Sequence, residues 1–134
     1  MITNPSRVVP RGTNGGVSWV GFLVSFLGGC IVGLAYYIGI LLGGQTMIQS
    51  QNCPQFYVIF LGGISGLLGS IFDSILGATT QFSGWDQERK CVVDKMGPDV
   101  IPICGKALLD NHTVNLIASM LTALCTPFIA MYVF

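Results

Sequence analysis

The sequence predicts an all-α fold: a polytopic membrane helix bundle with three transmembrane helices and a cytosolic N-terminus. Hydrophobic residues make up 51% of its 134 residues and charged residues only 9%, whereas soluble proteins carry about 25% charged residues. Three stretches are long enough to cross about 30 Å of hydrocarbon, which takes about 20 apolar residues. The composition therefore predicts a multi-pass integral membrane protein surrounded by membrane lipid.

The three spans divide the chain into six segments of one membrane domain, 1–134. The first span has no charge and is too long for the core of a secretory signal. The second contains one ionisable residue, Asp73, and the third contains none. In order, the N-terminal segment, span one, first loop, span two, second loop and span three are predicted at residues 1–17, 18–42, 43–56, 57–80, 81–113 and 114–134.

Lysine and arginine are unevenly placed and predict the orientation of the chain. They occur before span one and in the second loop but not in the first loop, and the cytosolic side carries the excess of these residues. The six are Arg7, Arg11, Arg89, Lys90, Lys95 and Lys106. We therefore expect the first loop and Phe134 on the lumenal side. That loop contains Gln45, Gln49, Gln51, Asn52 and Cys53.

Small residues recur at every fourth position in each span. In lipid, such residues let helix backbones approach closely, and hydroxyl groups bond between helices. The spacing predicts helix–helix association through glycine and serine faces. The sets are Gly21, Ser25, Gly29 and Gly33 in span one, Gly62, Gly66, Ser70, Ser74 and Ala78 in span two, and Ala118, Thr122, Thr126 and Ala130 in span three.

Three polar segments are expected to converge at one membrane face: residues 12–16, 73–81 and 110–115. In the first, Thr13 or Asn14 is expected to cap the helix of span one, whose free N–H groups, with Gly15 and Gly16, attract anions such as phosphate. A plain glycine-rich loop is the alternative.

The other two segments contain the acidic residues. Asp110 or Asn111 is expected to cap span three, and Asn111, Asn115 and Ser119 share a helix face. Asp73 and Asp110 are the candidate catalytic residues, and together they would suit Mg²⁺ holding a substrate phosphate. The alternative is that Asp73 bonds to Asn115, Thr122 or Ser74 and orders the bundle while Asp110 only caps a helix.

The second loop has charges of mixed sign and no basic patch, which excludes specific nucleic-acid binding. Its apolar residues are expected to form a short hairpin around the Gly97-Pro98 turn. These residues are Val92, Val93, Val100, Ile101 and Ile103.

Three motifs occur in order along the chain: PRGTNGGVSWVG (10–21), GGISGLLGSIFDSILGATTQ (62–81) and GKALLDNHTVNL (105–116). Together they resemble the C-terminal half of the transmembrane protein 19 family, a domain of unknown function numbered 92. His112 stands where the family more often has asparagine. The resemblance covers nearly the whole chain, but the family is about twice as long, so we expect a fragment or short isoform.

The resemblance implies a multi-pass membrane protein whose animal members lack an established activity. A plant relative is a phytyl-phosphate kinase, which implies Mg²⁺, a nucleotide and a polyprenyl phosphate as alternative cofactors and substrate. On that alternative, Thr13, Asn14, Gly15, Gly16, Asn111 and Asn115 are phosphate-binding candidates. A third class, a transporter or assembly subunit, would use Asp73 as an intramembrane proton or cation site.

Overall fold

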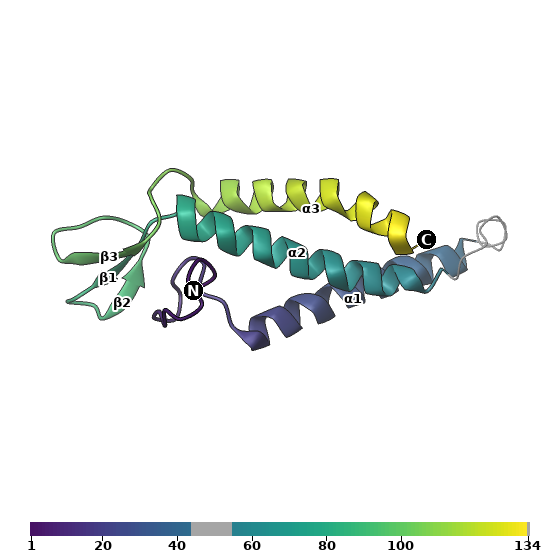
Figure 1. Cartoon of the computed structure of the whole chain (residues 1–134), viewed down its shortest axis with the longest axis horizontal. Helices are drawn as coiled ribbons and strands as arrows, with labels where there is room; N and C mark the ends of the chain where they lie inside the picture. Colours follow the sequence, from purple (N-terminus) through teal and green to yellow (C-terminus); the bar gives the residue numbers. More distant parts are fainter. Residues whose placement is uncertain (44–54, 134) are drawn as a thin grey trace. The chain divides into compact units, whose positions relative to one another are not determined.

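The computed structural model describes residues 1–43 and 55–133. Its helices and strands follow the order α1 (Trp19–Leu42), α2 (Tyr57–Thr80), β1 (Ser83–Asp86), β2 (Cys91–Val93), β3 (Val100–Cys104) and α3 (Asn111–Val133) (Figure 1). All three helices are long and apolar enough to cross a membrane. The predicted first loop, 43–56, and Phe134 lie almost wholly outside the described residues, and the side of the membrane on which each loop lies stays a prediction.

The chain forms two compact units, each of which contains part of α2 and part of α3. One unit contains residues 1–18 and 71–120, and the other contains residues 19–70 and 121–134. We call them the loop unit and the glycine unit. The loop unit includes the sheet, the end of α2 and the start of α3, whereas the glycine unit includes α1.

In the glycine unit, α1 and α2 pack directly through glycine, as the four-residue spacing predicts. A Cβ on Gly29 would come within 2.8 Å of the carbonyl carbon of Gly62, and a Cβ on Gly33 within 2.7 Å of the carbonyl oxygen of Val58. Gly66 likewise packs against the backbone of α1. Only glycine permits the two backbones to come this close. The resulting van der Waals contact holds the helices together in lipid, where the hydrophobic effect does not drive helices to associate.

Hydroxyl groups join α2 to α3 in the same unit. The hydroxyls of Ser65 and Thr126 are hydrogen-bonded at 3.0 Å, and Thr126 also donates to the Thr122 carbonyl at 2.8 Å when its hydroxyl hydrogen points that way. The helix continues through Pro127 to Val133. The small and hydroxylated face predicted for span three therefore lies against α2.

The second loop forms a three-stranded antiparallel sheet, so the prediction of a purely all-α fold was wrong. The expected hairpin would pair β2 with β3, but both strands pair with β1, in the order β2-β1-β3. Trp85 lies between Val92 and Ile101 in the ladder. The sequence Ser-Gly-Trp-Asp of β1 has no β-branched residue, which is why strand propensity does not reveal the central strand.

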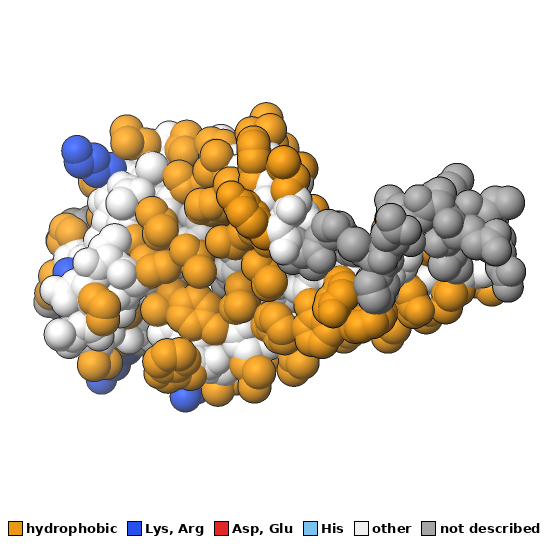
Figure 2. All heavy atoms as spheres, turned by 45° about the vertical axis from the view of Figure 1, so that its right-hand side comes forward, with side chains coloured by type: hydrophobic (Ala, Val, Ile, Leu, Met, Phe, Trp, Pro, Cys, Tyr) orange, Lys and Arg blue, Asp and Glu red, His pale blue; other side chains and the backbone are white. Residues whose placement is uncertain are grey.

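Apolar side chains cover the outside of the helices. Figure 2 shows one face on which they gather, and on α1 and α3 Ile31 and Leu124 are 68% and 65% exposed. Soluble proteins rarely expose contiguous apolar surface of this extent. The helices are therefore suited to a lipid environment.

Neighbouring glycines of α1 provide a matched test of the α1–α2 contact. Gly29→Ala would place a methyl group against the α2 backbone and should destabilise the protein by about 1–3 kcal/mol, the usual cost of overpacking. Gly28→Ala is the control because a Cβ there meets nothing within 4 Å, and it should be neutral or stabilising by up to about 1 kcal/mol. Unfolding of both variants in detergent measures the difference, and equal stability would contradict the contact.

Candidate functional site

The segment Gly105–Asp110 closes the end of α2 and begins α3. The N–H groups of Leu108 and Leu109 donate to the Thr80 carbonyl at 3.0 and 3.1 Å, and that of Lys106 donates to the Thr79 carbonyl at 3.1 Å. These carbonyls have no partner within the helix because they lie in its last turn. The segment therefore provides hydrogen-bond partners for the last carbonyl groups of one span, a few residues before the next span starts.

A left-handed glycine allows this close approach. Gly105 has φ +73°, and a Cβ there would clash with the carbonyl oxygen of Gln81. Any other residue would be strained in its backbone and would overlap the chain that leaves α2. Gly105 thus fixes where the Gly105–Asp110 segment lies against Gln81.

Asp110 caps α3, as predicted. Its Oδ1 accepts the Thr113 N–H at 2.9 Å, and α3 begins at the next residue, Asn111. Hydrogen bonds from the Thr113 side chain and backbone hold the pKa of the Asp110 carboxyl below its usual range. The carboxylate is exposed at the start of the helix, where the helix dipole also favours negative charge.

The N-terminal glycine turn, residues 12–16, packs against α2 and the start of the sheet within the loop unit and does not cap α1, so the capping prediction for Thr13 and Asn14 was wrong. Helix α1 begins only at Trp19. The Thr13 hydroxyl donates to the Pro10 carbonyl at 2.8 Å, and the Gly16 N–H donates to the Thr13 carbonyl at 2.9 Å. These groups hold the turn itself, and the helix-terminus argument for an anion at residues 13–16 no longer applies.

Asn14 ties this turn to the start of the sheet. Its backbone N–H donates to the Ser83 hydroxyl at 3.0 Å, its side-chain Nδ2 donates to the Phe82 carbonyl at 3.3 Å, and its carbonyl accepts the Cys104 thiol at 3.3 Å. Gly15, buried with φ +73°, packs against Ser74 and Ala78 of α2. The glycine turn is thus a docking element that places Asn14.

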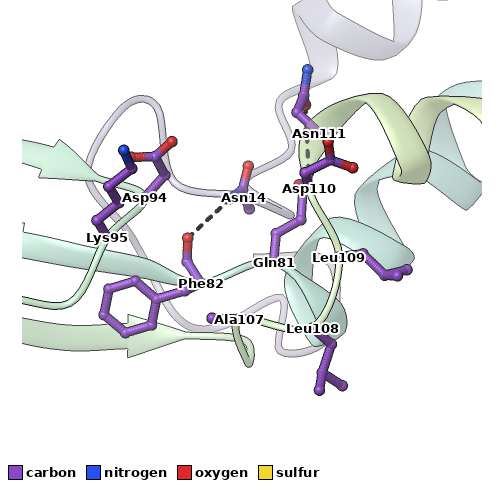
Figure 3. A pocket seen from close by; sticks show the side chains of 10 residues that line it. All are labelled: Asn14, Gln81, Phe82, Asp94, Lys95, Ala107, Leu108, Leu109, Asp110 and Asn111. Carbon is purple, nitrogen blue, oxygen red and sulfur yellow. Dashed lines mark hydrogen bonds between the residues drawn. The ribbon is translucent and has the colours of Figure 1, made fainter.

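A cavity of about 500 Å³ lies where these elements meet (Figure 3). Its volume falls in the range of small-molecule sites. Asn14, Gln81 and Asn111 come from the three predicted polar segments, whose convergence is therefore observed, and Gln81 Nε2 donates to Asn111 Oδ1 at 3.5 Å. The lining residues are Asn14, Gln81, Phe82, Asp94, Lys95, Ala107, Leu108, Leu109, Asp110 and Asn111.

Asp94 and Lys95 line this cavity, although the sequence predicted no role in a site for either residue. The antiparallel ladder places Val93 opposite Gly84, so the two residues after Val93 return to the level of Phe82 and Ser83. Figure 3 shows Asn14 between the Asp94–Lys95 pair and the Asp110–Asn111 pair. An acidic residue next to a basic one in the sequence is only a weak indication of a binding site. The pairing of β1 with β2 is what brings Asp94 and Lys95 to the cavity.

Asp73 is not among the residues that line the cavity. It is half-buried in α2 and precedes Gln81 by eight residues, or about 12 Å at 1.5 Å per residue. A Mg²⁺–oxygen bond is about 2.0–2.1 Å long, so this geometry gives no support to an ion shared by Asp73 and Asp110, which stays a prediction. Asn115 is exposed on α3, one turn beyond Asn111. Thr13, Gly15 and Gly16 lie beside Asn14 but do not line the cavity.

Three membrane-length apolar helices and a small polar unit define the class of this chain: it is a multi-pass integral membrane protein. The chain belongs to the family described as "Integral membrane protein DUF92", whose model matches residues 1–123. The family expected from the three motifs is thereby confirmed.

One curated relative is Protein PGR of Arabidopsis thaliana, 42% identical over 128 residues. The match covers 96% of this chain but 44% of that relative, so the chain spans less than half the relative's length. No solved structure matches the chain.

The cap on α3 should depend on pH. Because the pKa of Asp110 is lowered in the folded protein, its stabilising contribution is present above its unfolded pKa and is lost as pH falls through the folded pKa. Asp110→Asn should therefore show a smaller fall in thermal midpoint than wild type between about pH 6 and pH 3. Asp99→Asn, at an exposed carboxylate of the same unit, is the control and should behave like wild type. Parallel curves for all three proteins would contradict the role of the charge.

Proposed function

We propose that the cavity binds the phosphate of a membrane lipid, and that full-length members of the family use it in a Mg²⁺- and nucleotide-dependent phosphorylation of a polyprenyl phosphate. The observation that carries the proposal is the gathering of Lys95, Asp94 and Asp110 in one cavity at the ends of two spans. The proposal concerns the full-length proteins because this chain spans 44% of its curated relative.

The cavity has two kinds of lining that suit a phosphorylated lipid. Lys95 supplies a positive charge, and Asn14, Gln81 and Asn111 supply amide groups that donate to phosphate oxygens. Ala107, Leu108 and Leu109 form an apolar part next to the helix ends. A ligand with an anionic head and an apolar chain matches both parts.

The residues present also fit Mg²⁺. Mg²⁺ is usually held by one or two carboxylates together with substrate phosphates, and Asp94 and Asp110 both line the cavity. Within the described ranges, no group of three or more His, Cys, Asp or Glu side chains is placed to hold a metal, so the substrate phosphates would complete the coordination. When bound, the ion would neutralise charge on the phosphate oxygens.

In the proposed reaction, a phosphate oxygen of the lipid forms a bond to the γ-phosphorus of the nucleotide. The bond from that phosphorus to the β–γ bridging oxygen breaks, and the nucleoside diphosphate leaves. Lys95 would hold the lipid phosphate, and the amide side chains would orient it. We place the nucleotide site in the part of full-length relatives outside this chain.

Lys95 is the decisive residue for this proposal. In a full-length family member that contains this segment, reconstituted with phytyl phosphate, nucleoside triphosphate and Mg²⁺, Lys95→Gln should lower kcat/KM by about 10²-fold, the usual loss of one electrostatic donor. Lys90→Gln is the control because Lys90 is exposed and outside the cavity lining, and it should retain activity. Equal turnover of both variants, or a wild-type protein that makes no diphosphate, would refute the proposal.

A second function is supported by the position of Asp73. A carboxylate within a span is costly in lipid and usually marks an ion or proton path, and Asp73 does not line the cavity. A transporter would use it as a cation or proton site. Wild-type proteoliposomes should then show ion-dependent flux without nucleotide, and Asp73→Asn should abolish it. Flux that survives this substitution would exclude Asp73 as the site.

A further inference from the structure

The turn Ala107–Leu109 combines exposure with a fixed position. Leu108 is 68% exposed, although leucine is among the residues most often buried. Its backbone is nevertheless held, because its N–H donates to the Thr80 carbonyl at 3.0 Å. Figure 3 shows the Leu108 side chain directed away from the polar side chains of the cavity. An apolar side chain is thus presented outward from an anchored backbone.

The turn is continuous with surfaces suited to lipid. The candidate span of α2 ends at Thr80, to which the turn is bonded, and the candidate span of α3 begins at Asn111, two residues after Leu109. On the adjacent part of α3, Leu116 and Met120 are also exposed and four residues apart. The turn therefore lies beside the ends of both candidate spans.

We propose that the turn Ala107–Leu109 inserts into the acyl-chain boundary of the bilayer and forms a lipid-facing lip of the cavity. A ligand would then enter the cavity from the bilayer and not from the aqueous phase. The entry route rests on the proposed lipid ligand, whereas insertion of the turn is a property of the chain alone. Buried apolar area drives such interfacial insertion, to a depth of about 5–10 Å.

Another exposed residue of the same unit is a matched control. Met96 is 70% exposed, nearly the same as Leu108, but it directly precedes Gly97. The Gly97 carbonyl accepts the Val100 N–H at 3.3 Å, and Val100 pairs with Asp86 at the end of β1 that is farther from α2. If exposure alone led to lipid contact, both residues would reach the bilayer. If the position at the helix ends decides it, only Leu108 will.

Tryptophan fluorescence distinguishes these cases. With both native tryptophans replaced (Trp19→Phe, Trp85→Phe), Leu108→Trp and Met96→Trp are each reconstituted in phosphatidylcholine vesicles, with or without brominated acyl chains. Bromolipid should quench Leu108→Trp about twofold, as expected for a ring at the acyl-chain boundary, and aqueous iodide should quench mainly Met96→Trp. Ala107→Trp, a second position in the turn, should behave like Leu108→Trp.

Two outcomes overturn the inference. One is that iodide quenches the turn positions as strongly as Met96→Trp while bromolipid does not. The other is that bromolipid quenches all positions equally, because the turn would then not be a distinct lip. Circular dichroism checks that each variant retains its helix content. A kinase assay without product would refute the proposed function but would leave the measured depth of the turn unchanged.

Discussion

The loop unit depends on one constraint, the need to satisfy the carbonyl groups at the end of α2. The last carbonyl groups of a helix have no partner within it, and backbone groups left unpaired beside the hydrocarbon are costly. The carbonyls of Thr79 and Thr80 are paired with the N–H groups of Lys106, Leu108 and Leu109, more than 25 positions later in the chain. This pairing places the start of α3 beside the end of α2 and makes the intervening sheet fold back.

The candidate site is a consequence of that arrangement. Asp110 caps α3 at the end of the pairing segment, Gln81 directly follows α2, and the strand ladder returns Asp94 and Lys95 to the same level. Asn14 then joins from the N-terminal turn through three hydrogen bonds. Residues with ordinary local roles, such as a helix cap and a docking asparagine, thereby line one cavity of mixed polarity.

Sequence reasoning identified part of this site because local rules apply there. An acid before a helical segment predicts a cap, and Asp110 provides one. The same rule failed at Thr13 and Asn14, because α1 begins only at Trp19 and the glycine turn bonds elsewhere. Asp94 and Lys95 were missed because their place depends on which strands pair, and β1 has a composition that does not indicate a strand.

By itself, the sequence determined the membrane class, the three spans and the small-residue faces of the helices, because apolar length and residue spacing act within one helix. The tertiary structure alone decided the order β2-β1-β3, the docking of the glycine turn and the separation of Asp73 from the cavity. Those features depend on contacts between residues far apart in the chain. The local preference of each segment for helix, strand or turn does not determine these contacts, since many different pairings of the segments are compatible with the same preferences.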